Sequence, residues 1–256
     1  MNRIYFETVS FIKFLLRVFY SFINGGEECV ICKKRTFLLP VCKKCENQSF
    51  SLKSSADIKR CEICGKELIS TDKLCLQCRE SPVLKHTDFV LPLFSYRLWN
   101  KELMFKWKSQ GIRTLSFYFA RILSGFLREF GVDVIVPVPP RPGKIEKTGW
   151  DQIDELCTIL KYHYGFKILP LLERHSVEQQ KKLDRQNRLD SIGKSYFLRS
   201  DLQISRLLKP FQGTFPQKVC VLDDVCTTGA TLESCAYLLK KIGIKKVMGV
   251  TLFIVD

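Results

Sequence analysis

Four Cys-x-x-Cys pairs, crowded between residues 29 and 78, constrain this chain more than any other feature of its sequence. The pairs are Cys29/Cys32, Cys42/Cys45, Cys61/Cys64 and Cys75/Cys78. Two intervening residues allow a tight turn to direct both sulfurs of a pair at one ion, and zinc binds four such ligands tetrahedrally. The sequence therefore predicts two zinc ions. Disulfides and an iron–sulfur cluster are the alternatives.

The spacing favours a sequential grouping, with the first two pairs on one ion and the last two on the other. Nine residues separate the first two pairs, ten separate the last two, and fifteen lie between the halves. A crossed grouping of the first pair with the third stays open. Because all eight thiolates act as ligands, we expect structural sites without an open catalytic position. A module this short folds poorly without its metal.

Three segments follow from this pattern: an N-terminal amphipathic helix over residues 1–28, the double zinc-binding module over 29–80, and a larger domain over 86–256. The N-terminal segment is apolar and aromatic but interrupted by charges, and no cleavage site follows it. Phe11, Leu15, Val18 and Phe22 would share one helical face.

We expect this helix to pack on its own protein. Association with a membrane surface is the alternative. Metal-type cysteine pairs without secretory targeting predict a cytoplasmic protein, which could also be membrane-peripheral.

The formal net charge of the chain is +15. Eight thiolates and two zinc ions lower it by four, which leaves the chain clearly basic. A basic chain suits a polyanionic partner such as nucleic acid, a phosphorylated substrate or an acidic lipid headgroup. A merely solvated, highly soluble surface is the alternative.

The third segment alternates strand-like and helix-like stretches. Short β-branched runs at 133–139 and 218–224, with further candidates at 167–172 and 246–253, are separated by helical spacing at 150–165 and 231–243. Strands that alternate with helices are typical of a parallel sheet with crossover helices, so we expect an α/β fold.

The run VCVLDDVCTTGAT, from Val219 to Thr231, has the pattern of a strand followed by a phosphate-binding loop. Asp223 and Asp224 would lie at the carboxyl end of a buried strand, where ligands bind in open parallel sheets. Small residues and hydroxyls then lead into a helix, so that backbone N–H groups converge on a phosphate. The carboxylates suit ribose hydroxyls or Mg²⁺ shared with a pyrophosphate. The predicted loop residues are Thr227, Thr228, Gly229, Ala230 and Thr231.

This run resembles the phosphoribosyl pyrophosphate (PRPP) motif of type I phosphoribosyltransferases, and the rest of the chain is similar to the ComF family. That family pairs a cysteine-rich zinc module with a phosphoribosyltransferase-like domain and is linked to DNA uptake in natural competence. The stretches LMFKWKSQG, IVPVPPRP and ERHSVEQQKKLDRQNRLDSIGKSYF carry the similarity. In the first, Lys106 and Trp107 match a Lys-Tyr-x-Gly segment. In the third, the residues that keep the family spacing are Arg174, Gln180, Leu183 and Arg188.

The resemblance implies a five-stranded parallel sheet flanked by helices, with the segment 98–111 in a hood. It also implies PRPP binding with Mg²⁺, and a DNA-uptake machinery as a partner that the N-terminal helix could contact. Thr148, Trp150 and Asp151 depart from the family, which usually has Arg, Phe and Asn there, and Ser191 stands where Asn is usual. These departures place the anion contacts of those loops in doubt but leave the phosphate loop intact.

Two functions compete. The first is a competence protein that binds PRPP or a related phosphoribosyl ligand and handles single-stranded DNA. The second is an active phosphoribosyltransferase of nucleotide metabolism. We favour the first because no residue is an evident general base or glutaminase nucleophile, so the catalytic residues stay unknown. The oligomeric state is also left open by the sequence.

Two basic stretches would contact DNA, with Phe37 or Trp150 stacking on bases. Asp184 and Asp190 dilute the first stretch, and the zinc thiolates offset the second. The first comprises Lys181, Lys182, Arg185, Arg188, Lys194 and Arg199, and the second comprises Lys33, Lys34, Arg35, Lys43 and Lys44.

Overall fold

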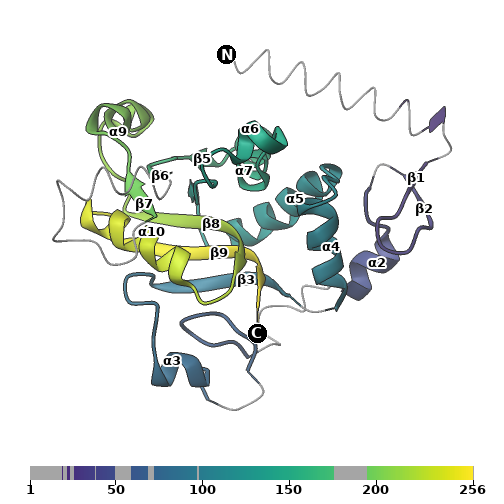
Figure 1. Ribbon diagram of the computed structural model, residues 1–256, viewed down its shortest axis with the longest axis horizontal. Coiled ribbons are helices and arrows are strands. Elements are labelled where there is room, and N and C mark those ends of the chain that lie inside the picture. The colour runs from purple at the N-terminus through teal and green to yellow at the C-terminus, as the bar shows by residue number, and fades with distance from the viewer. Residues whose placement is uncertain are drawn as a thin grey trace.

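A five-stranded parallel sheet forms the centre of the protein (Figure 1). The computed structural model describes residues 19, 22–23, 26–37, 39–49, 59–68, 72–96, 98–175 and 195–255. The strand order is β3-β9-β8-β4-β5, and every neighbouring pair is parallel. The strands are β3 (Phe89–Ser95), β9 (Lys246–Ile254), β8 (Lys218–Cys226), β4 (Val134–Pro137) and β5 (Lys167–Ile168). The predicted α/β fold with a parallel sheet is confirmed.

Helices cover both faces of this sheet, so its central strands are apolar on both sides. One face packs against α4 (Leu98–Lys108), α5 (Thr114–Glu129) and α7 (Gln152–Tyr164), and the other against α10 (Ala230–Lys241). Side chains of β8 alternate between two hydrophobic clusters: Cys220 and Leu222 join the α5 side, while Val219 and Val221 join the α10 side.

Smaller elements complete the α/β domain. The antiparallel hairpin of β6 (Leu172–Arg174) and β7 (Tyr196–Leu198) lies beside α10, and α6 (Lys144–Thr148) follows the carboxyl end of β4. Helix α9 (Asp201–Leu207) and the 3-10 turn η1 (Lys209–Phe211) lead into β8. The strand predicted over 167–172 is divided between β5 and β6, because Pro170 between them cannot donate to a ladder.

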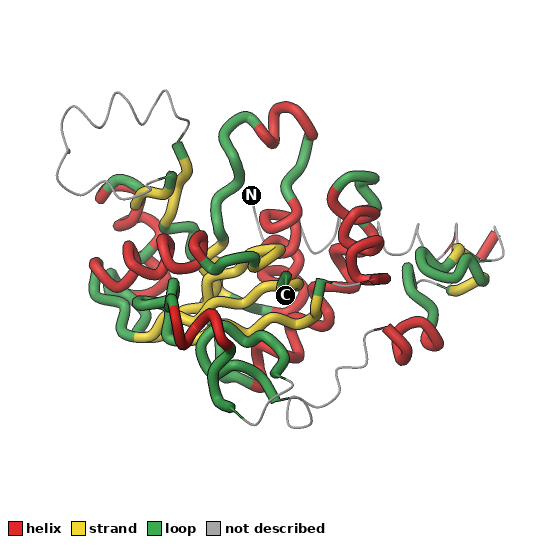
Figure 2. The backbone as a smooth tube through the Cα atoms, turned by 60° about the horizontal axis from the view of Figure 1, so that its bottom comes forward, coloured by secondary structure: helices red, strands yellow, loops and turns green. Residues whose placement is uncertain are grey.

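The two halves of the cysteine segment lie against different parts of the domain (Figures 1 and 2). The first knuckle comprises residues 26–37 and 39–49, with β1 (Glu27–Glu28), β2 (Arg35–Thr36) and α2 (Lys43–Ser49). The second knuckle comprises residues 59–68 and 72–80, with α3 (Leu76–Glu80). Each knuckle contributes buried residues to a different one of the two clusters that flank the sheet.

The first knuckle packs on α4 and α5. Cys29, Val30 and Val41 are buried in the cluster that contains residues of both helices. Lys106 of α4 donates to the Val30 carbonyl at 2.7 Å, and Arg121 of α5 forms an ion pair with Glu46 at 2.5 Å. This knuckle therefore shares the core of the domain.

The second knuckle covers the edge strand β3. The Val90 N–H donates to the Ile63 carbonyl at 2.8 Å. Gly65 has a φ of +72°, and a Cβ there would lie 2.4 Å from the Val90 carbonyl oxygen, so only glycine fits this contact. Pro92, which has no N–H to donate, is tolerated at this edge. The knuckle thus protects an edge that would otherwise be open to pairing with another chain.

The structure extends some predicted elements and leaves others undescribed. Strand β8 runs two residues beyond the predicted 218–224, and α10 already begins at Ala230. Most of the predicted N-terminal helix and all of 176–194 lie outside the described residues. In the part that is described, no helix combines the length and the apolar character needed to cross a membrane.

Candidate functional site

The eight paired cysteines form two separate four-sulfur clusters. Within each cluster all four Sγ atoms lie within 4.8 Å of one another. Sulfurs of different pairs come close: Cys32 and Cys42 are 3.7 Å apart, and Cys64 and Cys75 are 3.6 Å apart. The clusters are Cys29, Cys32, Cys42 and Cys45, and Cys61, Cys64, Cys75 and Cys78. The sequential grouping is therefore the one that the structure adopts.

Both clusters fit zinc by their geometry. A tetrahedral zinc site with Zn–S bonds of about 2.3 Å separates its sulfurs by a little under ~4 Å, which the observed spacings match. The Cys42 N–H donates to Cys29 Sγ at 3.3 Å, a contact that stabilises a thiolate. Two Cys₄ groups can therefore hold two structural zinc ions.

Electrostatics within the clusters also call for a cation. Burial disfavours the Cys29 thiolate, yet N–H groups of Cys32, Cys42 and Ile31 lower its pKa to about 7. Burial and hydrogen bonds from neighbouring thiols raise the pKa of Cys45 to about 12. The second cluster repeats this, with the pKa of Cys61 lowered to about 7 and that of Cys78 raised to about 12. Four crowded sulfurs ionise together only when a dication offsets their repulsion.

The predicted phosphate loop joins β8 to α10. Thr227 and Thr228 are exposed, and Gly229 caps the helix with a φ of +83°. That left-handed conformation favours glycine, and the Leu84 side chain would lie 2.9 Å from a Cβ at this position. Ala230 and Thr231, predicted in the loop, form the first turn of α10. The loop therefore presents exposed hydroxyls at a helix N-terminus, where the Gly229 N–H donates to the Cys226 sulfur and the Ala230 N–H donates to Thr228 Oγ1 at 3.4 Å.

The adjacent carboxylates of β8 serve different surroundings. Asp224 forms an ion pair with Lys108 of α4 at 2.6 Å. Asp223 accepts from the Asp224 N–H at 2.8 Å, and its charge acts on Cys235 and Tyr196, which belong to the cluster on the α10 side. The two carboxylates nevertheless lie close together, because Asp223 and Asp224 share a side-chain hydrogen bond and the charge of Lys108 acts on both.

Asp223 is poised to titrate near neutrality. Burial, followed by the charge of Asp224, raises its pKa to about 7, although the Asp224 N–H and Lys108 oppose the rise. Thr251 is its partner in the register of β9, and the buried Thr251 hydroxyl has no hydrogen-bond partner among the described residues. A ligand hydroxyl or cation that approached Asp223 would favour its ionised form.

Residues around the loop include several that the sequence did not single out. Lys108, rather than Lys106, contacts the acidic pair, because Lys106 reaches the first knuckle and Trp107 is buried. Tyr196 of β7 hydrogen-bonds with the Thr231 side chain. Arg174, predicted from family spacing, lies over the Tyr196 ring at 5.1 Å. Helical register within 98–108 is the signal that separates Lys106 from Lys108.

The departures after β4 have a structural role. Asp151 caps α7, accepting from the N–H groups of Ile153 at 2.9 Å and Asp154 at 3.1 Å. Lys144 of α6 neutralises it at 2.5 Å. Trp150 is half-buried with Arg113 over its ring. Asp151 therefore adds no free negative charge beside the loop.

Of the six basic residues predicted to contact DNA at 181–199, only Arg199 lies within the described residues. Gln180, Leu183, Arg188 and Ser191 also lie outside them. On the first knuckle, by contrast, the five predicted cations are exposed, and the Phe37 side chain is 50% exposed.

Comparison with known proteins gives one informative similarity. No family model matches the chain. The chain is 27% identical over 193 residues to the competence protein ComFC of Streptococcus pneumoniae (strain ATCC BAA-255 / R6). The aligned region covers 74% of this chain and 78% of ComFC.

We predict that the purified protein holds close to two equivalents of zinc, because each cluster offers four thiolates to one ion. Cys61→Ser should release one equivalent and lower the thermal unfolding temperature, since three thiolates hold zinc poorly. Metal analysis by mass spectrometry is the measurement. As a control, Cys157→Ala alters a buried cysteine that belongs to neither cluster and should keep both ions. Freely titrating thiols without zinc would refute the prediction.

The raised pKa of Asp223 predicts a pH-dependent stability difference for Asp223→Asn. Asp223 of the unfolded chain loses its proton near pH 4, whereas Asp223 of the folded protein keeps it until about pH 7. Rising pH between these two values therefore lowers the free energy of unfolding. The variant should match the wild type near pH 4 and exceed its free energy of unfolding above pH 7 by up to roughly 4 kcal/mol, which is what a rise of the pKa from 3.8 to about 7 corresponds to. Denaturant unfolding across this range measures it, and a pH-independent difference would contradict it.

Proposed function

We propose that the chain is a competence-related protein of the ComF family whose β8–α10 loop binds PRPP or a related phosphoribosyl ligand. The observation that carries the proposal is the loop itself. Exposed Thr227 and Thr228 and the left-handed Gly229 stand at the N-terminus of α10, directly after Asp223 and Asp224. Converging N–H groups suit a phosphate, and the carboxylates beside them suit ribose hydroxyls.

Mg²⁺ enters this proposal with the pyrophosphate of the ligand. Asp224 is held by Lys108 and Asp223 has a raised pKa, so neither carboxylate is an idle surface group. A cation that arrives with the ligand would add positive charge beside both. We therefore expect Mg²⁺ to strengthen PRPP binding more than it strengthens the binding of ribose 5-phosphate, which lacks the pyrophosphate.

Single-stranded DNA is the partner that we propose for the first knuckle. The first knuckle carries five exposed cations and a Phe37 ring that is half exposed. Proteins that bind single-stranded nucleic acid combine phosphate contacts with base stacking in this way. The name of the S. pneumoniae relative, a competence protein, agrees with a role in handling DNA.

An active phosphoribosyltransferase is the second candidate. The observation in its favour is the pKa of Asp223, about 7, which suits a group that exchanges protons during a reaction. Incubation with PRPP, Mg²⁺ and a panel of nucleobases distinguishes the two. Release of pyrophosphate that depends on a nucleobase would favour the transferase, and stable PRPP would favour the binding protein.

We predict that PRPP binds in a Mg²⁺-dependent manner and that Thr228→Glu abolishes the binding, because the new carboxylate would occupy the place of the phosphate. Isothermal titration calorimetry is the measurement. Thr214→Glu, which puts the same charge on an exposed threonine after η1, should bind like the wild type. Equal affinity in the wild type and Thr228→Glu would show that the loop is not the site.

We also predict that a labelled single-stranded oligonucleotide binds with little sequence preference and with steep salt dependence. Each neutralised phosphate contributes a slope of about −0.7 in log K against log salt. Replacing Lys34, Lys43 and Lys44 together with Glu should flatten that slope in fluorescence anisotropy.

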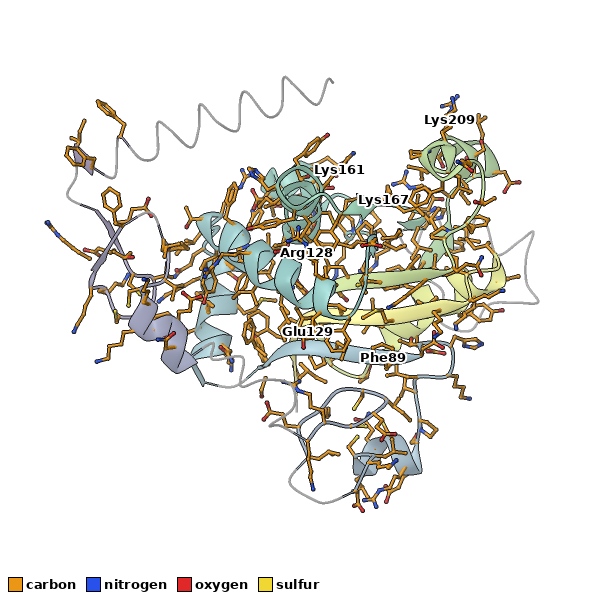
Figure 3. The ribbon with its side chains drawn as sticks, turned by 180° about the vertical axis from the view of Figure 1, so that it is seen from behind. Phe89, Arg128, Glu129, Lys161, Lys167 and Lys209 are labelled. Carbon is orange, nitrogen blue, oxygen red and sulfur yellow. The ribbon has the colours of Figure 1, made fainter. Side chains whose placement is uncertain are left out.

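The control replaces three exposed lysines far from the first knuckle: Lys209 on η1, together with Lys245 and Lys246 at the start of β9. Figure 3 shows Lys209 on the side of the domain away from that knuckle. If both triple variants lose the same affinity, net charge rather than the first knuckle governs binding. Flat anisotropy at low salt would exclude the DNA proposal.

A further inference from the structure

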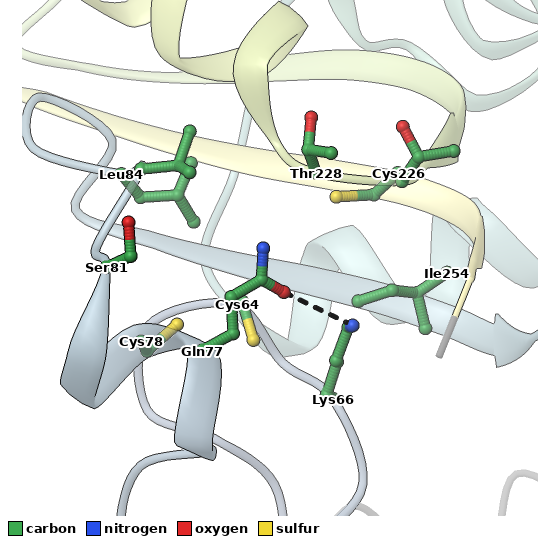
Figure 4. A pocket seen from close by; sticks show the side chains of 11 residues that line it. Cys64, Lys66, Gln77, Cys78, Ser81, Leu84, Cys226, Thr228 and Ile254 are labelled. Atoms are coloured by element: carbon green, nitrogen blue, oxygen red, sulfur yellow. Dashed lines mark hydrogen bonds between the residues drawn. The ribbon is translucent and has the colours of Figure 1, made fainter.

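The second knuckle and the phosphate loop together enclose a small pocket (Figure 4). Cys64, Lys66 and Cys78 line it from the knuckle, and Thr227 and Thr228 line it from the loop. Lys66 is the one charged side chain among the described residues that line this pocket. The second knuckle therefore contacts the loop as well as the edge of β3.

The zinc cluster itself fixes Lys66. The Cys61 N–H donates to the Lys66 carbonyl at 2.8 Å, and the Lys66 N–H donates to the sulfur of Cys64. The side chain is only partly exposed, and its Nζ lies 3.5 Å from Gln77 Oε1 (Figure 4). Both backbone groups of Lys66 are thus tied to zinc ligands, which fixes the point from which its side chain extends along the pocket.

The charge of Lys66 reaches the loop. Burial and the Asp223 charge raise the pKa of Cys226 to about 11, and Lys66 opposes that rise. Cys226 directly precedes Thr227, the first exposed residue of the loop. The charge of Lys66 is therefore felt by the side chain that directly precedes the loop, and Lys66 lines the same pocket as Thr227 and Thr228.

A phosphate at this loop faces an electrostatic difficulty that Lys66 can offset. Four thiolates around Zn²⁺ carry a net charge of −2, and two of the second cluster's sulfurs, those of Cys64 and Cys78, come from residues that line the pocket. A phosphate also carries negative charge, so the two groups repel. A cation that lies between them turns this repulsion into attraction over a short distance.

We propose that Lys66 is a binding residue for the 5-phosphate of the phosphoribosyl ligand, so that the second knuckle is part of the ligand site. This inference rests on the proposed function and deepens it. The knuckle then has two roles: it covers the edge of β3, and it supplies the cation that the loop residues 227–231 lack. Ligands that carry the 5-phosphate need Lys66, whereas pyrophosphate alone does not.

The test compares Lys66→Met with the wild type in calorimetric titrations of ribose 5-phosphate, of PRPP with Mg²⁺, and of pyrophosphate with Mg²⁺. We expect Lys66→Met to bind both phosphoribosyl compounds about tenfold more weakly and pyrophosphate as the wild type does. Lys66→Arg keeps the charge and should stay within about threefold of the wild type. Lys73→Met is the matched control, because Lys73 is an exposed lysine of the same knuckle that pairs with Glu62.

Zinc content and thermal unfolding are measured for every variant, so that loss of the knuckle is recognised. If Lys66→Met keeps two zinc ions and binds ribose 5-phosphate within twofold of the wild type, the role of Lys66 is overturned while phosphoribosyl binding stands. An equal loss in Lys73→Met would overturn it too, since the effect would then be one of net charge. If the wild type binds neither phosphoribosyl compound, the proposed function fails, and this inference fails with it.

Discussion

Each set of four cysteines must hold its sulfurs within reach of one ion, and the arrangement of the N-terminal third depends on that constraint. A knuckle of this size cannot bury a core of its own. Both knuckles instead use the core of the α/β domain: Cys29 and Val41 are buried with residues of α4 and α5, and Cys61 and Cys64 are buried on the α10 side. The two zinc sites are consequently attached to clusters on opposite faces of one sheet.

This attachment links the zinc sites to the phosphate loop. Gly65 lets the second knuckle approach β3 closely, and Leu84, in the connector that follows the knuckle, packs where a Cβ of Gly229 would be. The loop therefore packs against Leu84, which follows the zinc-binding second knuckle in the chain. The charged residues near the loop come from three different elements. Lys66 belongs to the second knuckle, Lys108 to α4, and Asp223 and Asp224 to β8. The surroundings of the loop are therefore assembled from elements that are far apart in the chain.

The site was predicted best where chemistry and local structure coincide. Cys-x-x-Cys spacing is a local turn, and strand–loop–helix around residues 218–231 follows from β-branched residues, glycine and helical periodicity, so both were recognisable. The contacts across the site were not. Lys106 matched a family pattern, yet helical rotation directs it to Val30 and directs Lys108 to Asp224. The adjacent aspartates were expected to act together, but their unequal environments, with Lys108 paired to Asp224 and Asp223 buried, depend on how α4 packs beside β8.

The four Cys-x-x-Cys pairs, the α/β class and the position of the loop could be recognised from the sequence alone, because each depends on a local pattern of residues, whereas the grouping of the pairs into two clusters is a result of the fold. The packing of the knuckles against opposite faces, the pairing of Lys108 with Asp224 and the approach of Lys66 to Thr227 and Thr228 were decided only by the tertiary structure. The knuckle contacts join residues that are up to 76 positions apart, and the last two join residues more than a hundred positions apart. Such contacts depend on how the elements pack, which no local pattern of residues specifies.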